Sequence, residues 1–333
     1  MERSKLKLLR VLDILKDTDE LNPTTTNEIV KKLELYGIEA ERKSVLRDIA
    51  TLTDYGYDIL LHSDNKLGYY IASRDFEDWE LKVLCDAAMS SKCLTVKDKE
   101  NLVKKISGLS SKMGKSLLQK TTISVNNSIN ENGMTKVFID KIMSAIKMGK
   151  KIEFKYVKTN AKLEKEYKRD GWVYVINPYT IIWKNDKYYL IGNYDKYDDL
   201  SYYRLDRIRD LVILEDKAKP LSDVLGSDSR RKLEEYIEKS IYTYSGETVN
   251  LTLKTYDYMI DDLVDYFGRN IHIQNHNDYL LVSVNTVLSN GLYYWLMQFG
   301  EHITVISPEE VRTEFKRRMG IIYRNYKEKS NDK

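Results

Sequence analysis

The sequence contains little cysteine, proline and glycine: 2 Cys, 4 Pro and 15 Gly among 333 residues. Cys85 and Cys93 lie eight positions apart without a second pair, which excludes a disulfide framework and every common zinc spacing. Pro and Gly are too few for long disordered linkers. No stretch reaches the roughly 18 apolar residues of a membrane-spanning helix, and the first 20 residues interrupt their apolar positions with charge, unlike a secretory signal. We therefore expect an ordered cytoplasmic protein of two or three domains.

Charge is nearly balanced, with 54 Lys and Arg against 51 Asp and Glu. A net charge of +3 neither demands nor excludes a nucleic-acid partner. The first 75 residues hold 12 basic and 14 acidic residues, so this part of the chain is not basic as a whole. Any nucleic-acid interface must therefore come from a local arrangement of side chains.

The first 75 residues show three amphipathic helical patterns followed by two short strands. Apolar residues recur at helical spacing over residues 6–15, and a second pattern with a capping box covers residues 25–37. A third helix is expected over residues 41–54, and "YDILLHSDNKLGYYIA" reads as a hairpin with Lys66 near its tip. Three helices and a hairpin in this order predict a winged helix-turn-helix.

The third helix carries cationic and hydroxyl groups opposite its apolar stripe of Val45, Ile49 and Leu52. In a helix-turn-helix the second helix of the motif enters the major groove, where Arg and Lys suit guanine acceptors. Such a charged row on an isolated helix is usually a solvated face, but its place before a wing favours DNA contact. The residues expected to contact DNA are Arg42, Lys43, Ser44, Arg47, Thr51 and Lys66.

The rest of the chain predicts an α+β multidomain fold. Two helical patterns follow the hairpin, and a polar run near residues 121–135 marks a domain boundary. Short β runs with intervening turns then suit a small barrel, and alternating strands and helices near the C-terminus suit a compact α+β module. The expected segments are the winged domain 1–74, a helical connector 75–133, the barrel with a leading helix 134–216, a helical linker 217–246 and the α+β module 247–333.

The stretch "SYYRLDRIRD" crowds arginines among tyrosines and aspartates. Cationic and aromatic groups together are what a phosphate backbone with stacked bases requires, and guanidinium groups also bind phosphate in a bidentate manner. The alternative is an edge strand whose arginines pair with Asp206 and Asp210, and the residues alone leave both interpretations open. The arginines are Arg204, Arg207 and Arg209, and the tyrosines are Tyr202 and Tyr203.

Three stretches together resemble one protein family. "ERKSVLRDIATLTDYGYDI" with the later "GYYI" is similar to the winged helix-turn-helix of bacterial WYL-domain transcriptional regulators, and "NPYTIIWKNDKYYLIGNYD" followed by "YYRLDRIRDL" resembles the WYL signature. "LYYWLMQFGEHITVISPEEVR" resembles the C-terminal extension called WCX. The signature Trp-Tyr-Leu reads Tyr188-Tyr189-Leu190 here, and we expect Tyr188 and Leu190 to share one face of a strand with Tyr189 on the other.

The resemblance implies that the WYL domain is an Sm-like β barrel that binds a ligand, in several members single-stranded nucleic acid, and relays its state to the DNA-binding domain. It places a ligand site at Tyr179, Tyr203, Arg204 and Arg207. Helix-turn-helix proteins usually pair across a palindrome, so we also expect a homodimer. The predicted function is that of a transcriptional regulator that binds operator DNA and senses a single-stranded nucleic acid or a nucleotide.

One alternative is a nucleic-acid-binding accessory factor that modulates a defence nuclease or another effector. An enzyme is not expected, because no Gly-rich phosphate loop, nucleophile elbow or paired-carboxylate pattern occurs in a fitting context. His272 and His276 lie four apart in a strand-like stretch, where helical convergence on a metal is lost. We therefore expect no catalytic residue, cofactor, metal or membrane association.

Overall fold

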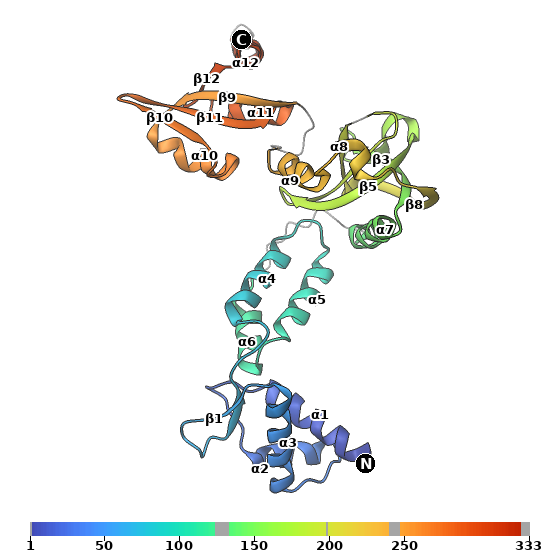
Figure 1. Ribbon diagram of the computed structural model, residues 1–333, viewed down its shortest axis with the longest axis vertical. Coiled ribbons are helices and arrows are strands. Elements are labelled where there is room, and N and C mark those ends of the chain that lie inside the picture. The colour runs from blue at the N-terminus through green and yellow to red at the C-terminus, as the bar shows by residue number, and fades with distance from the viewer. Residues whose placement is uncertain (1, 124–132, 198, 240–246, 328–333) are drawn as a thin grey trace. The chain divides into compact units, whose positions relative to one another are not determined.

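The computed structural model describes residues 2–123, 133–197, 199–239 and 247–327 and forms two compact units, residues 1–133 and 134–333 (Figure 1). No helix in these described ranges is long and apolar enough to cross a membrane. The first unit contains α1 (Glu2–Lys16), α2 (Thr26–Leu35), α3 (Arg42–Tyr55), β1 (Ile59–Leu61), β2 (Tyr69–Ile71), α4 (Asp78–Ser90), α5 (Val96–Ser107) and α6 (Lys112–Thr121).

Helices α1 to α3 and the β1–β2 hairpin form the predicted order of three helices and a wing. α2 begins with the predicted capping box between Thr25 and Glu28. α3 buries Val45, Ile49 and Leu52 against α1 and α2, which confirms the predicted apolar stripe. β1 and β2 pair antiparallel on either side of a polar turn.

The wing has a third strand-like member, because Thr24 forms an antiparallel bridge with Tyr69 of β2. The Thr24 N–H donates to the Tyr69 carbonyl at 2.9 Å, and the Tyr69 N–H donates back at 2.7 Å. Gly68 lies at this crossing with φ +95°, and a Cβ there would lie 2.2 Å from the Thr24 carbonyl oxygen. The position therefore requires glycine both for its backbone conformation and for its space.

Gly68→Ala is expected to lower the free energy of unfolding of the first unit by about 3 kcal/mol or more, since backbone strain and a backbone clash add. Gly37→Ala is the matched control, because Gly37 also has a positive φ, +68°, but nothing lies within 4 Å of its Cβ position. The control should cost only about 1–2 kcal/mol. Urea denaturation monitored by circular dichroism measures the free energy of unfolding of both variants. An equal loss of stability in the two variants would show that the contact with Thr24 is unimportant.

The described part of the connector, residues 75–123, contains three helices, whereas the sequence predicted two. Ser111 is the N-cap of α6, and its hydroxyl accepts the Gly114 N–H at 3.0 Å. Gly108 and Gly114 interrupt the helical pattern, and for this reason the start of α6 was not predicted from the sequence. At Gly114 a side chain is excluded, since a Cβ would lie 2.0 Å from the Ser110 hydroxyl oxygen.

Polar contacts join this connector to the winged domain. The Arg74 guanidinium donates to the Thr18 carbonyl at 2.5 Å, and the Ser111 hydroxyl donates to the Asp19 carboxylate at 2.5 Å. Burial works to raise the pKa of Asp19, but the hydrogen bonds from Ser111 and Asn22 outweigh it and hold that pKa below its ordinary value. Partly buried polar contacts therefore tie the segments that precede α4 and α6 to the end of α1 and the turn that follows it.

The barrel of the second unit is a curled sheet in which β3 pairs with both β5 and β8. The strand order β8-β3-β5-β6-β7 encloses one core with α7, in which Phe154, Ile176 and Leu190 are buried. This confirms the small barrel expected for this part of the chain. Its elements are α7 (Met134–Met148), β3 (Lys150–Thr159), β4 (Lys165–Tyr167), η1 (Lys168–Gly171), β5 (Val173–Lys184), β6 (Lys187–Asn193), β7 (Leu200–Arg204), η2 (Leu205–Arg207) and β8 (Ile208–Lys217), followed by α8 (Leu221–Leu225) and α9 (Ser229–Lys239).

The C-terminal module has the order β-α-β-β-α-β and one further helix, as expected for a compact α+β module. Its antiparallel sheet has the strand order β10-β11-β9-β12. Trp295 is fully buried beneath it, with Phe267 and Phe299 packed edge-on or tilted against its ring. The elements are β9 (Thr248–Thr255), η4 (Asp257–Met259), α10 (Ile260–Phe267), β10 (His272–His276), β11 (Tyr279–Val287), α11 (Asn290–Gln298), β12 (Thr304–Ser307) and α12 (Glu309–Lys327).

Candidate nucleic-acid interface and ligand pocket

Three cations extend from the exposed face of α3. Arg42, Lys43 and Arg47 are exposed, and none of them forms an ion pair with another residue that the structure describes. Lys43 and Arg47 lie opposite the buried stripe, and Arg42 is exposed beside it in the first turn, so the winged domain presents all three cations to solvent. The local arrangement gives this helix a positive face although the domain as a whole is slightly acidic.

Ser44 does not lie on this outward face, so that part of the prediction is wrong. It is half-buried, and its hydroxyl accepts a hydrogen bond from the Lys7 ammonium of α1. The same ammonium forms a 2.9 Å ion pair with Asp48, one turn further along α3. Ser44 therefore lies beside the buried stripe, on the flank that packs against α1, and its hydroxyl helps to orient the two helices.

The two other predicted positions remain exposed. The Thr51 hydroxyl donates to the Arg47 carbonyl at 2.9 Å, which uses its proton but leaves its acceptor lone pairs free. Lys66 lies in the wing turn, where its backbone N–H donates to the Asp64 carboxylate at 3.0 Å and its side chain extends into solvent.

The four predicted ligand residues do not meet in one pocket. Tyr203 and Arg204 are neighbours in β7 and therefore point to opposite faces of the sheet. Tyr203 packs inside the barrel, with ring centroids 5.2 Å from Phe154 and 5.9 Å from Tyr174. Arg204 lies on the other face, together with Tyr202.

Arg204 forms the ion pair that the alternative interpretation predicted. Its guanidinium donates to both carboxylate oxygens of Asp206, at 3.0 and 2.7 Å. Burial works to raise the pKa of Asp206, but the hydrogen bonds and charge of Arg204 outweigh it and hold the pKa below its ordinary value. Arg204 is therefore already neutralised, whereas Arg207 forms no ion pair with any described residue.

Tyr179 also lies away from Tyr203. Its hydroxyl donates to the Lys219 carbonyl at 3.0 Å, and its ring packs with the cluster of Ile191, Leu200 and Leu233 beneath α8 and α9. Burial raises the pKa of Tyr179 to about 12. Its position indicates a structural role, in which it fixes the chain after β8 against the barrel.

A pocket of about 450 Å³ opens beside Tyr203. Aromatic rings form much of its wall, and two cationic side chains, Arg169 and Lys196, lie at its edge without an ion pair to any residue in the described ranges. Burial raises the pKa of Tyr203 to about 12, so the phenol stays neutral at physiological pH and does not repel an anion. The lining residues are Arg169, Trp172, Tyr174, Tyr194, Lys196, Tyr197, Ser201 and Tyr203.

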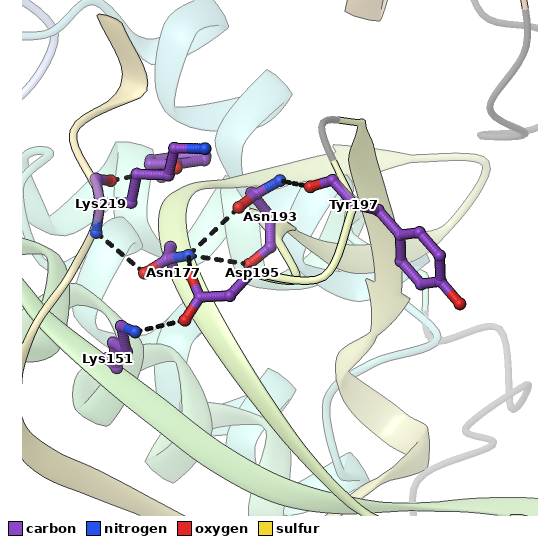
Figure 2. Close-up of polar contacts among 7 residues, drawn as sticks. Lys151, Asn177, Asn193, Asp195, Tyr197 and Lys219 are labelled. Atoms are coloured by element: carbon purple, nitrogen blue, oxygen red, sulfur yellow. Dashed lines mark hydrogen bonds and ion pairs between the residues drawn. The ribbon is translucent and has the colours of Figure 1, made fainter. Parts of the chain in front are cut away.

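A buried amide network fixes the segment that carries part of this pocket (Figure 2). Asn177 is fully buried, and its amide donates to Asp195 at 2.6 Å and to Asn193 at 3.2 Å. The side-chain oxygen of Asn177, Oδ1, accepts a hydrogen bond from the Lys219 backbone N–H at 2.9 Å. Asn193 in turn donates to the Tyr197 carbonyl at 2.6 Å, while the Tyr197 ring points away from the network.

Lys151 completes the network with an ion pair to Asp195. The hydrogen bonds from Lys151 and Asn177 hold the pKa of Asp195 below its ordinary value. The backbone of residues 193–197, which bears Tyr194 and Lys196, is therefore anchored to β3, to β5 and to the chain after β8.

The sequence predictions missed most of the pocket. "KRDGWVY" and "NYDKY" show the same mixture of cations and aromatics as "SYYRLDRIRD". This mixture is the sequence signal that points to the pocket residues. Arg169 and Asp170 also adopt left-handed backbone conformations, with φ of 51° and 52°. Such strain at non-glycine residues often accompanies functional sites.

Comparison with known proteins identifies two domains. The family model of the WYL domain matches residues 137–213, and that of the WCX domain matches residues 247–320. Residues 137–213 are therefore a WYL domain and residues 247–320 a WCX domain, as the sequence resemblance predicted for these parts of the chain. The predicted strand arrangement also holds: Tyr188 and Leu190 pack in the barrel core, while Tyr189 faces Tyr202.

Two solved structures are similar over much of the chain. The first is "Proteasome accessory factor B/C (PafBC) of Arthrobacter aurescens", with 17% identity over 93% of this chain and 47% of that chain and a TM-score of 0.29. The chain thus spans about half the length of that protein. The second is "Crystal structure of a CRISPR Cas-related protein", with 12% identity over 77% of this chain and 76% of that chain and a TM-score of 0.36. No curated protein matches.

Proposed function

We propose that this protein is a transcriptional regulator that binds operator DNA through α3 and the wing and binds single-stranded nucleic acid or a nucleotide in its WYL domain. The observation that carries the proposal is the exposure of Arg42, Lys43 and Arg47 at the start of a helix that precedes a wing, without an acidic partner among the described residues. A recognition helix needs cations available for phosphates and base edges. Lys66 in the wing supports it as a second phosphate contact.

The pocket beside Tyr203 supports the sensing part of the proposal. Aromatic rings stack on bases of any sequence, and nearby cations bind the phosphates. The proposed ligand site is therefore the pocket that Tyr203 shares with Trp172 and Lys196. Tyr179 and Arg204 do not line this pocket, and Arg207 is a further cation outside its lining. A ligand would act by binding two arrangements of the DNA-binding domains unequally.

Selection of a random duplex library by the full chain tests the regulator proposal. We expect enrichment of one sequence with two related half-sites, because a dimer would place its two α3 helices in successive major grooves. Absence of any enriched duplex, together with tight binding to single strands, would instead favour the accessory-factor interpretation.

Trp172→Ala is expected to weaken binding of a labelled oligothymidylate by about tenfold, because stacking on one base contributes about 1–3 kcal/mol. Trp172 is 53% exposed, so its loss should leave the barrel folded. Trp79→Ala is the matched control, since Trp79 is 64% exposed and lies on α4, outside the WYL domain. Fluorescence anisotropy measures both affinities. Equal affinity of the Trp172 variant and the wild type would exclude this pocket as the ligand site.

Arg204→Ala is expected to leave duplex affinity unchanged and to change oligothymidylate affinity less than threefold, because its guanidinium is occupied by Asp206. The same anisotropy titrations measure both quantities. Loss of single-strand binding on this change alone would return the ligand site to the outer face of β7.

A further inference from the structure

Four residues of α3 form a continuous stripe on its outward side. They follow each other at intervals of three, one and three positions, so they lie on one side of the helix over two turns. The buried stripe of this helix lies on the opposite side. The four residues are Lys43, Leu46, Arg47 and Ala50, and all are exposed. Two cations and two apolar side chains therefore share the outward side.

The apolar members of this outward stripe do not contribute to the core of the winged domain. Leu46 is 36% exposed and lies outside the apolar cluster that joins α3 to α1 and α2. Ala50 is exposed one turn further along the helix. A solvated side of a helix favours charged and polar residues, so solvation explains Lys43 and Arg47 but not the leucine between them.

Acidic residues limit the part of α3 that can approach a duplex. Glu41 precedes the helix and Asp54 lies in its last turn, and both are exposed without an ion pair to a described residue. Phosphates repel both carboxylates. Lys43 and Arg47 lie between these two positions and attract phosphates and base acceptors. The favourable contact with DNA therefore runs from residue 42 to residue 51.

The side chains of the outward stripe match two kinds of base edge in the major groove. Arg and Lys donate to the O6 and N7 acceptors of guanine, and apolar side chains contact the 5-methyl group of thymine. Leu46 and Arg47 are consecutive, about 1.5 Å apart along the helix axis, whereas successive base pairs lie about 3.4 Å apart. Because one Watson–Crick pair cannot contain both guanine and thymine, the two side chains require neighbouring base pairs.

We propose that Arg47 reads a guanine and that Leu46, together with Ala50, reads the methyl group of a thymine in the neighbouring base pair. The guanidinium donates to both guanine acceptors, and the apolar side chains exclude water from the methyl group. Each half-site of the operator then contains a guanine and a thymine in neighbouring pairs. The inference names the bases that α3 selects and so rests on the proposed function.

Base analogues in the selected duplex test this assignment with the full chain. Deoxyuridine lacks only the 5-methyl group of thymidine, and 7-deazaguanine replaces the N7 acceptor of guanine by a C–H group. We expect deoxyuridine at one position to lower the affinity about fourfold per half-site, which corresponds to burial of one methyl group. We expect 7-deazaguanine in the neighbouring pair to lower it at least about threefold. Fluorescence anisotropy measures both losses.

Two variants pair each base edge with its side chain. In Leu46→Ala, deoxyuridine should cost less than about twofold per half-site, because the methyl group has already lost its main partner. In Arg47→Ala, 7-deazaguanine should cost equally little, while the sensitivity to deoxyuridine remains. Leu84→Ala is the matched control, since Leu84 is 42% exposed but lies on α4, and its sensitivity to both analogues should equal that of the wild type. Circular dichroism confirms that each variant is folded.

A selected duplex that tolerates deoxyuridine at every thymine overturns the inference. An equal loss in Leu46→Ala and the wild type also overturns it, since another residue then contacts the methyl group. If Leu46→Ala binds too weakly to titrate, selection of the random library by Arg47→Ala decides. The enriched sequence should then keep the thymine and lose the guanine beside it, and retention of both bases would contradict the inference. Failure of the regulator proposal is seen separately, because the wild type then enriches no duplex at all.

Discussion

Replacement of Arg42, Lys43 and Arg47 together by alanine is expected to weaken operator binding by about 100-fold or more. Each lost base or phosphate contact removes about 1–3 kcal/mol, and all three side chains are exposed in the first two turns of α3. The salt dependence should fall as well, because each phosphate contact contributes about 0.9 to the slope of log K against log salt. Fluorescence anisotropy of the selected duplex over a salt series gives both quantities.

A triple alanine variant of Lys97, Lys104 and Lys105 controls for the loss of three positive charges. These lysines are exposed on α5 and do not belong to α3. This control should bind the duplex within about threefold of wild type, since long-range charge contributes less than direct contact. If both variants lost affinity equally, α3 would have no special role in duplex binding.

Asn177→Leu is expected to lower the free energy of unfolding of the second unit by about 3–5 kcal/mol. The amide is fully buried and bonds to three partners, and its removal leaves the Lys219 N–H and one Asp195 oxygen without those bonds. Affinity for oligothymidylate should fall too, although Asn177 does not line the pocket, because residues 193–197 lose an anchor. Thermal denaturation and anisotropy measure the two effects.

Asn275→Leu provides the control for this change. Asn275 lies in β10 and is exposed, so the same substitution there removes no buried hydrogen bond. Its melting temperature and oligothymidylate affinity should match those of the wild type. Unchanged stability of the Asn177 variant would mean that the network around Asp195 contributes nothing to the barrel.

The sequence predicted those parts of the fold that depend on local periodicity. The stripe of Val45, Ile49 and Leu52 and the alternation of Tyr188, Tyr189 and Leu190 follow from helical and strand geometry alone, and both are observed. The helix α6 was missed because Gly114 lies in its first turn, where its packing against Asp78 and Ser110 demands a residue without a side chain.

Site residues that depend on tertiary contacts could not be predicted in this way. Ser44 has the chemistry of a DNA contact, but α1 supplies Lys7 as its partner, and no local pattern shows this. The pocket joins residues from η1, β5, β7 and the segment after β6, which only the strand register brings together. The resemblance selected the domain that contains the pocket and one of its lining residues, Tyr203, while sheet alternation separates Tyr203 from Arg204.

Anisotropy of the selected duplex, measured with and without oligothymidylate at two salt concentrations, tests the central claim most directly. We expect saturable, salt-sensitive binding that persists at a salt concentration where an unrelated duplex no longer binds. The duplex affinity should change at least about threefold when the single strand occupies the WYL domain. Trp172→Ala should raise the oligothymidylate concentration needed for this change by about tenfold while leaving duplex affinity intact. Equal weak binding to all duplexes, unaffected by single strands, would contradict the account.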